Sequence, residues 1–118
     1  MISEKRILVV EDDAITSDAL KMVLELEGYQ VDCAANGQEA LKHLQQTVEK
    51  PDLILLDLFM PVMDGKQFRE EQKSHPAFSH IPVVVLSGAD RETTMDASGY
   101  IVKPFQPDEL LKAVRHHA

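Results

Sequence analysis

The sequence is poor in the features that mark secreted and membrane-spanning chains. It holds one cysteine, Cys33, so no disulfide can form within the chain and nothing argues for an oxidising compartment. No apolar run approaches the roughly 20 residues that a membrane-spanning helix needs. The polar start of the chain, up to Arg6, lacks the apolar segment of a signal peptide. We therefore expect a cytoplasmic protein with no membrane association.

Basic residues are also scarce. Twelve Lys and Arg face 20 Asp and Glu, which gives a net charge of −8, and the sequence has no long basic run. Direct binding of nucleic acid is therefore not expected. The five histidines show no metal-ligand spacing with Cys33. The chain also lacks repeats and linkers, and its 118 residues fit one domain, over residues 1–118, with one core.

Five short apolar runs predict five β-strands, which cover residues 7–10, 31–35, 53–56, 83–86 and 100–102. Three of these runs, at 7–10, 53–56 and 83–86, continue over four residues, which is typical of strands that are buried on both faces. The run at 31–35 is interrupted by Asp32, as an edge strand tolerates. Strands that alternate with amphipathic helices favour an α/β fold with a parallel sheet that is covered on both faces.

Capping and stop signals predict where the helices begin and end. The first helix is expected to stop at Gly28. The second is expected to begin at Asn36, with Glu39 three residues on, as in a capping box. The third runs from about residue 64 to 74, and Pro107 suits the first turn of the last helix. The apolar positions at helical spacing, which predict the buried faces, are Ile15, Ala19, Val23 and Leu26; Ala40, Leu41, Leu44 and Val48; and Leu110, Leu111 and Val114.

Reactive side chains stand at the ends of four predicted strands. They are Glu11 and Asp12, Asp57, Ser87, and Lys103. The carboxyl ends of parallel strands share one edge of a sheet, where ligands bind. Three crowded carboxylates repel one another, and a hard divalent cation such as Mg²⁺ relieves that repulsion. With a lysine and a hydroxyl beside them, they form a receptor for a phosphoryl group, for which Asp57 can act as nucleophile.

Each of these residues has a plainer interpretation when it is taken alone. Asp57 could cap a turn, the others could be ordinary polar groups of loops, and Tyr100 could be a packed strand residue. Four reactive strand ends in one short chain favour the chemical interpretation.

The chain resembles the receiver domain of two-component response regulators over nearly its whole length. The matching segments are Ile7–Asp13, Asp57–Pro61 with Asp64-Gly65, Val85–Gly88 and Gly99–Phe105. The resemblance implies a flavodoxin-like, doubly wound (βα)5 fold whose five parallel strands lie in the order 2-1-3-4-5.

The resemblance also implies a role for each site residue. Asp57 would accept a phosphoryl group from the phosphohistidine of a sensor histidine kinase or of a histidine phosphotransfer protein. The residues that would hold Mg²⁺ are Glu11, Asp12, Asp57 and, through its backbone carbonyl, Phe59. Ser87 and Lys103 would grip the phosphoryl oxygens.

A conformational switch is implied as well. Ser87 would move toward the phosphate and Tyr100 would turn inward behind it, so that phosphorylation changes the surface of the domain. The Lys103-Pro104 peptide bond would be cis.

The chain departs from the family between Ser87 and Tyr100, where only 12 residues lie. A crossover with its helix needs roughly 10–12 residues, so the fourth helix is expected to be shortened or missing, with residues 91–96 as its helix-capable part. We therefore expect a monomer that signals through the phosphorylation-site loops or through the first helix.

Two other functions stay open at this point. A phosphohydrolase that turns over an aspartyl phosphate usually needs a second acid beside the nucleophile, and Leu58 and Phe59 offer none. A docking module that had lost the switch would not need the complete set of reactive residues. We expect a phosphoacceptor switch rather than an enzyme, and nothing in the sequence indicates its downstream effector.

Overall fold

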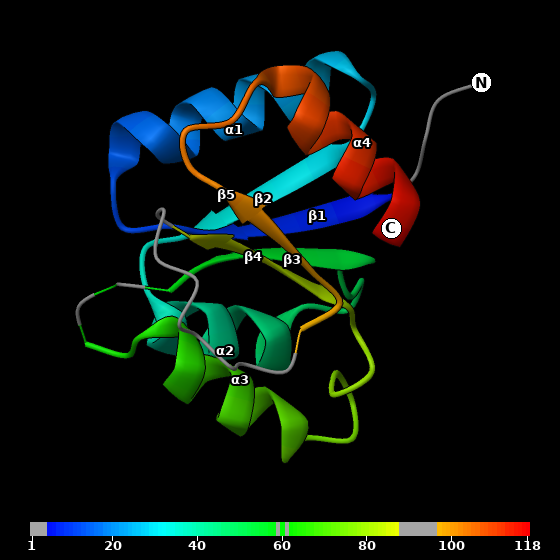
Figure 1. Ribbon diagram of the computed structural model, residues 1–118. Coiled ribbons are helices and arrows are strands. Elements are labelled where there is room, and N and C mark those ends of the chain that lie inside the picture. The colour runs from blue at the N-terminus through cyan, green and yellow to red at the C-terminus, as the bar shows by residue number, and fades with distance from the viewer. Residues whose placement is uncertain (1–4, 59, 61, 88–96) are drawn as a thin grey trace.

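The structure is a computed structural model that describes residues 5–58, 60, 62–87 and 97–118. The elements found in these residues are β1 (Arg6–Val10), α1 (Ala14–Leu26), β2 (Gln30–Ala34), α2 (Gly37–Gln46), β3 (Leu53–Asp57), α3 (Gly65–Lys73), β4 (Val83–Ser87), β5 (Gly99–Val102) and α4 (Pro107–His117). The strands form one parallel sheet in the order β2-β1-β3-β4-β5 (Figure 1), which confirms the predicted flavodoxin-like topology. The segment predicted to hold a short fourth helix, residues 91–96, lies outside the described residues.

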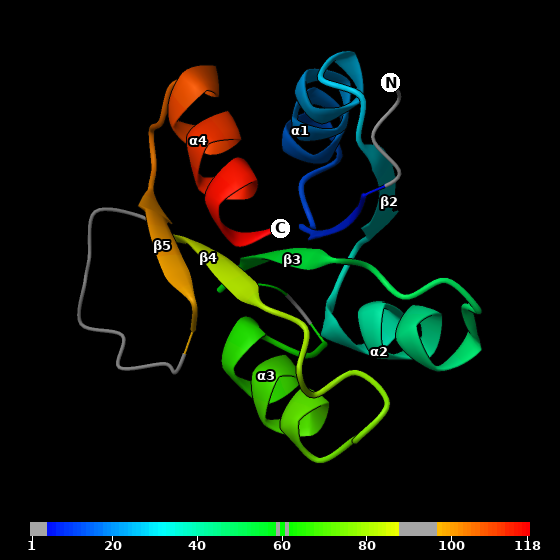
Figure 2. The ribbon, with the colours of Figure 1, turned by 90° about the vertical axis from the view of Figure 1, so that its right-hand side faces the viewer.

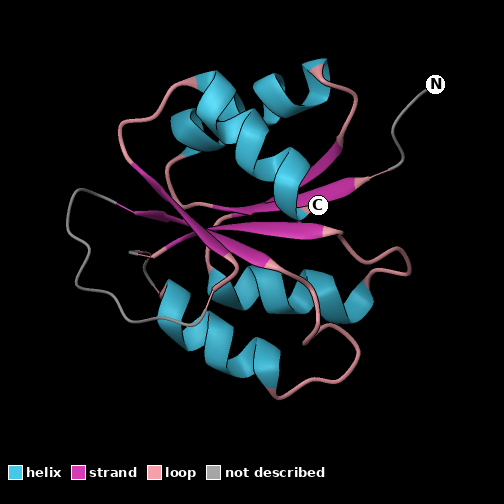
Figure 3. Ribbon diagram, turned by 45° about the vertical axis from the view of Figure 1, so that its right-hand side comes forward, coloured by secondary structure: helices cyan, strands magenta, loops and turns pink. Residues whose placement is uncertain are grey.

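Helices cover both faces of the sheet. Helices α1 and α4 lie on one face, and α2 and α3 lie on the other (Figures 2 and 3). Successive residues of a strand point to opposite faces, so β1 contributes to two hydrophobic clusters. Leu8 belongs to one cluster with Phe68 of α3, and Val9 belongs to the other with Leu24 of α1 and Leu110 of α4. The core therefore lies on both sides of the sheet, as the continuous apolar runs predict.

The predicted helix ends are confirmed. Helix α1 ends at Leu26, just before Gly28, whose φ of 97° suits a helix stop. The Asn36 side chain caps α2 by accepting a hydrogen bond from the backbone N–H of Glu39 at 2.9 Å. The Glu39 carboxylate accepts from the N–H of Ala35 rather than from that of Asn36, so the capping box is displaced by one residue. None of the described helices is long and apolar enough to cross a membrane.

The predicted buried face of α1 is wrong. Ile15 and Leu26 are each 80% exposed and Ala19 is exposed as well, whereas Val23 is half-buried and packs against the core. The residues that α1 buries are Ser17, Leu20 and Leu24. Two apolar stripes run along this helix, and helical spacing cannot tell which of them faces the sheet.

The predicted buried face of α2 is wrong at its last position. Ala40, Leu41 and Leu44 are buried as expected, but Val48 lies beyond the helix end at Gln46 and is 96% exposed. Helical spacing was extended there past the point at which the chain leaves the helix.

Among the described residues, Val62 alone combines a side chain with a positive φ, which is 69°. It lies between β3 and α3, and its side chain is exposed. A β-branched residue in the left-handed region is strained, and no buried contact of its side chain offsets that strain.

Replacement of Val62 by glycine is therefore expected to stabilise the fold. A left-handed conformation costs an L-residue about 1–2 kcal/mol, and glycine loses about 0.5–1 kcal/mol through the greater freedom of the unfolded chain. The free energy of unfolding in urea should rise by about 0.5–1 kcal/mol. Val48→Gly is the control, because Val48 is also exposed but its φ is not positive. Similar losses of stability in both variants would show that no strain is relieved at position 62.

Candidate functional site

Three carboxylates meet at the carboxyl edge of the sheet. Glu11 and Asp12 directly follow β1, and Asp57 is the last residue of β3. These strands are neighbours, with Val10 paired to Leu56, so their ends lie side by side. One oxygen of each carboxylate lies within 4.8 Å of one oxygen of the other two. Glu11 and Asp57 are buried, whereas Asp12 is exposed.

A lysine that follows the outermost strand, β5, reaches this cluster. Lys103 follows β5, and its Nζ lies 3.3 Å from Oε1 of Glu11 and 3.6 Å from Oδ1 of Asp57. The Lys103-Pro104 peptide bond is cis, as the resemblance implies. One positive charge therefore bridges the two buried carboxylates.

Glu11 carries the clearest electrostatic signature of the cluster. Burial raises its pKa, and the nearby carboxylate of Asp57 raises it further. Two contacts act in the opposite direction: the Lys103 ammonium and the backbone N–H of Asp13, which donates to Oε2 of Glu11 at 3.2 Å. The raised pKa shows that Lys103 and the Asp13 N–H together do not offset the burial of Glu11 and its contact with Asp57.

This donor set fits a hard divalent cation. It consists of carboxylate oxygens, which Mg²⁺ prefers over nitrogen or sulfur ligands. Burial and, to a smaller extent, the neighbouring Asp57 carboxylate raise the pKa of Glu11, and a bound cation would balance the negative charge of the ionised pair. The residues present are therefore suited to such an ion.

The other predicted site residues occupy the neighbouring strands. Ser87 ends β4, whose Leu86 is paired with Asp57. Tyr100 lies on β5, opposite Val85 of β4, and is 47% exposed. Phe59 lies outside the described residues. Sequence reasoning missed the N–H donated by Asp13 to Glu11, because a backbone donor leaves no mark in the sequence.

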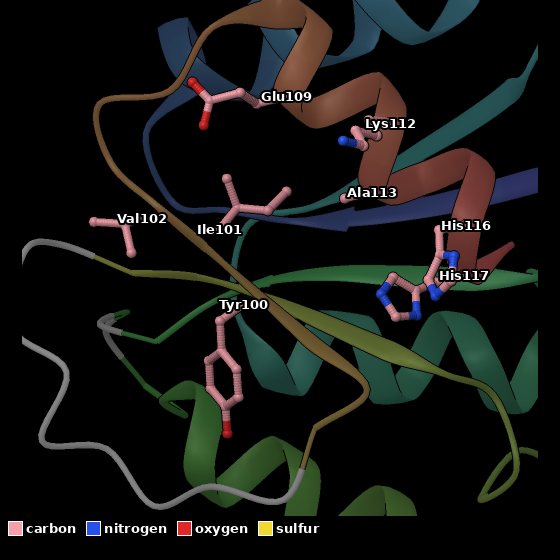
Figure 4. Close-up of a pocket in the computed structure, with 8 residues that line it drawn as sticks. All are labelled: Tyr100, Ile101, Val102, Glu109, Lys112, Ala113, His116 and His117. Atoms are coloured by element: carbon pink, nitrogen blue, oxygen red, sulfur yellow. The ribbon is translucent and has the colours of Figure 1, made fainter.

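A groove of about 610 Å³ lies elsewhere, between β5 and α4. Figure 4 shows Tyr100 and Ile101 on opposite sides of β5, with His116 and His117 on α4. Neither the three carboxylates nor Lys103 line this groove. The acidic cluster is therefore a separate, charged site at the sheet edge.

Comparison with known proteins shows the family to which this chain belongs. The model of the response regulator receiver domain matches residues 7–115. The chain belongs to the response regulator receiver domain family. Receiver domains of this kind act as phosphoacceptor switches and interact with sensor histidine kinases, and they typically bind Mg²⁺ at an acidic site.

Individual relatives agree with the family match. The chain is 39% identical to the probable transcriptional regulator ycf27 of Cyanophora paradoxa, over 97% of this chain and 48% of that protein. It is similar to the solved receiver domain of a signal transduction histidine kinase from Syntrophus aciditrophicus, with 34% identity and a TM-score of 0.87 over 95% of this chain and 88% of that one. The chemotaxis protein CheY4 of Vibrio cholerae is 30% identical, with a TM-score of 0.86 over 98% and 100% of the two chains.

The receiver domain spans about half the length of the curated relatives that it matches. The similarity therefore concerns only the matched half of each of those relatives.

Removal of the Glu11 charge is expected to stabilise the metal-free receiver domain at pH values above the raised pKa of Glu11. Below about pH 4.5, its ordinary value, Glu11 is protonated in both the folded and the unfolded states and carries no penalty. As the pH rises through the folded-state pKa, the ionised carboxylate destabilises the folded state. In buffers that contain a chelator, Glu11→Gln should therefore gain stability relative to the wild type between pH 4.5 and 7, as urea denaturation measures.

The matched control is Glu25→Gln, because Glu25 is exposed on α1. Its stability difference from the wild type should stay nearly constant over the same pH range. A Glu11→Gln difference that is equally flat, or that favours the wild type at pH 7, would contradict the electrostatic account of the cluster.

Proposed function

We propose that Asp57 accepts a phosphoryl group from the phosphohistidine of a sensor histidine kinase or of a histidine phosphotransfer protein. The observation that supports this most directly is the convergence of Glu11, Asp12, Asp57 and Lys103 at one edge of a receiver-domain sheet. In the transfer, an oxygen of Asp57 attacks phosphorus while the bond to the histidine nitrogen breaks, and that nitrogen keeps the electron pair.

We further propose that Glu11, Asp12 and Asp57, with the backbone carbonyl of Phe59, hold Mg²⁺. The ion supplies positive charge that lets an anionic donor approach a carboxylate. Glu11 and Asp57 are buried beside each other, so their charges are poorly screened by water and strongly favour a cation. Lys103 and Ser87 hold the phosphoryl oxygens.

The phosphoryl group then biases a switch in the neighbouring strands. Ser87 ends β4, and Tyr100 lies on the adjacent β5. The two strands are hydrogen-bonded, with Val85 opposite Tyr100 and Ser87 opposite Val102. Because the two strands are paired, a movement of Ser87 toward the phosphoryl group would be transmitted to β5 and would reposition the half-exposed Tyr100 side chain.

This proposal makes the chain, over residues 1–118, one monomeric receiver domain that acts as a switch and not as an enzyme on a separate substrate. A phosphohydrolase would need an acid to activate water beside Asp57, and Leu58, the next residue, is a buried apolar side chain. A docking module without phosphorylation would not need two carboxylates buried side by side. Burial and the neighbouring Asp57 raise the pKa of Glu11, so its ionised form destabilises the folded state.

The exposed stripe of α1 provides a surface for the phosphodonor. Ile15, Met22 and Leu26 are exposed on this helix at spacings that place them on one side. The helix begins at Ala14, directly after Asp12 and Asp13, so the stripe starts at the acceptor site. A donor protein that binds this helix would bring its phosphohistidine to the same edge of the sheet.

Phosphorylation at Asp57 is expected to be direct and Mg²⁺-dependent. Acetyl phosphate with Mg²⁺ should add one phosphoryl group to the wild type and none to Asp57→Asn, as intact-mass spectrometry measures. Asp13→Asn is the control, since asparagine can still cap α1 in place of Asp13. This control should be labelled like the wild type, and labelling of Asp57→Asn to the same extent would contradict the assignment.

A charge introduced on the exposed stripe of α1 is expected to slow phosphotransfer from a donor protein without slowing phosphorylation by a small donor. Ile15→Asp should slow transfer from a phosphohistidine donor protein by about tenfold, which is the typical effect of losing an important interface side chain. Labelling by acetyl phosphate should not change, because a small donor needs no docking surface. The exposed Val48 provides the control Val48→Asp, for which both rates should match the wild type. A slower acetyl phosphate reaction in Ile15→Asp would show damage to the site, and unchanged transfer from the protein donor would exclude docking on this stripe.

A further inference from the structure

The start of α3 lies against the backbone of the acceptor residue. Gly65 is the first residue of α3, and its N–H donates to the carbonyl oxygen of Leu58 at 2.9 Å. A Cβ atom placed on Gly65 would lie 2.8 Å from the carbonyl oxygen of Asp57 and 2.9 Å from Cα of Leu58. Real Cβ contacts are essentially never shorter than 3.0 Å and ordinary ones begin at 3.4 Å, so any side chain would force the two backbones about 0.2–0.6 Å apart.

Glycine is required here for space and not for conformational freedom. Among the glycines of the described residues, Gly28 is the one with a positive φ, so the backbone of Gly65 is one that other residues adopt. Asp64 caps the helix by a reciprocal pair of hydrogen bonds with Gln67, which holds the first turn of α3 in place. The close approach to Asp57 is therefore the feature that a side chain would disturb.

Of the two backbones, that of Asp57 is the less firmly held. Helix α3 is anchored by fully buried Phe68 and Gln72, and Nε2 of Gln72 donates to the carbonyl oxygens of Phe78 and Ile81. Pairing of β3 with β1 ends at Leu56, so the β4 side alone continues as far as Asp57. A side chain at position 65 would therefore displace the acceptor residue rather than the helix.

We propose that Gly65 is a positioning residue of the phosphoacceptor site: its lack of a side chain lets α3 pack on the backbone of Asp57 and fix the acceptor carboxylate relative to Glu11 and Asp12. This inference rests on the proposed function of Asp57 and adds a residue that touches neither the phosphoryl group nor the metal. The Asp57 carboxylate would have to attack phosphorus opposite the leaving nitrogen and also bind the cation together with Glu11 and Asp12. A small displacement of this carboxylate would therefore slow the reaction.

The test is Gly65→Ala, with two readouts taken on the folded protein. The rate of labelling by acetyl phosphate at a fixed Mg²⁺ concentration should fall about tenfold, since a displacement of about 1 Å can cost about 100-fold. The dissociation constant of Mg²⁺, measured by calorimetry, should rise as well. A purely structural role would lower the unfolding midpoint and leave both readouts unchanged.

The matched control is Gly99→Ala. A Cβ atom there would also meet a neighbour at 2.8 Å, but that neighbour is Nε2 of His117, at the end of a flexible side chain. This variant should react and bind Mg²⁺ like the wild type. If Gly65→Ala is partly unfolded, all three proteins are measured in sucrose, which favours the folded state, and the rates are expressed per folded molecule.

The outcomes separate this inference from the proposed function. Wild-type rate and Mg²⁺ affinity in Gly65→Ala would overturn the positioning role. Equal losses in Gly65→Ala and Gly99→Ala would also overturn it, because the effect would then not depend on contact with Asp57. If the wild type binds Mg²⁺ but takes no phosphoryl group, the proposed function is wrong, whereas weaker Mg²⁺ binding by Gly65→Ala alone would still support positioning.

Discussion

Repulsion among three carboxylates is the constraint on which the site of this receiver domain depends. Parallel pairing of β1 and β3 brings Glu11 and Asp12 beside Asp57, and two of the three side chains are buried. Lys103 supplies one positive charge at 3.3 and 3.6 Å, yet burial, together with the neighbouring Asp57 carboxylate, keeps the pKa of Glu11 raised. An arrangement that still lacks positive charge is suited to a divalent cation, and through it to an anionic phosphoryl donor.

Asp57, the proposed acceptor, lies between helix α3, which packs on its backbone, and the paired strands β4 and β5. On one side, α3 packs on the Asp57 backbone without room for a side chain at Gly65. On the other side, β4 is paired with β3 at Asp57 and with β5 at Tyr100. In the proposed mechanism the first contact keeps the nucleophile in place, and the second carries the effect of phosphorylation toward the edge of the sheet.

Much of this architecture could be predicted from the sequence, for physical reasons. Strands buried on both faces read as continuous apolar runs, and parallel pairing then requires their ends to share an edge, which brought Glu11 and Asp57 together in the prediction. The exposed stripe with Ile15 could not be assigned correctly, because α1 carries two apolar stripes and only packing against the sheet selects one. The close contact at Gly65 depends on the distance between a helix and a strand, which spacing along the chain does not encode.

The central claim, that Asp57 is the residue that this carboxylate cluster makes into a phosphoacceptor, is tested most directly by locating the modified side chain. Treatment with acetyl phosphate and Mg²⁺, reduction of the acyl phosphate with borohydride and peptide mass mapping would place a homoserine wherever an aspartate had been phosphorylated. The account predicts homoserine in place of Asp57, and only when Mg²⁺ is present. Homoserine in place of Asp12 or Asp13, or the same yield at Asp57 without a divalent cation, would contradict it.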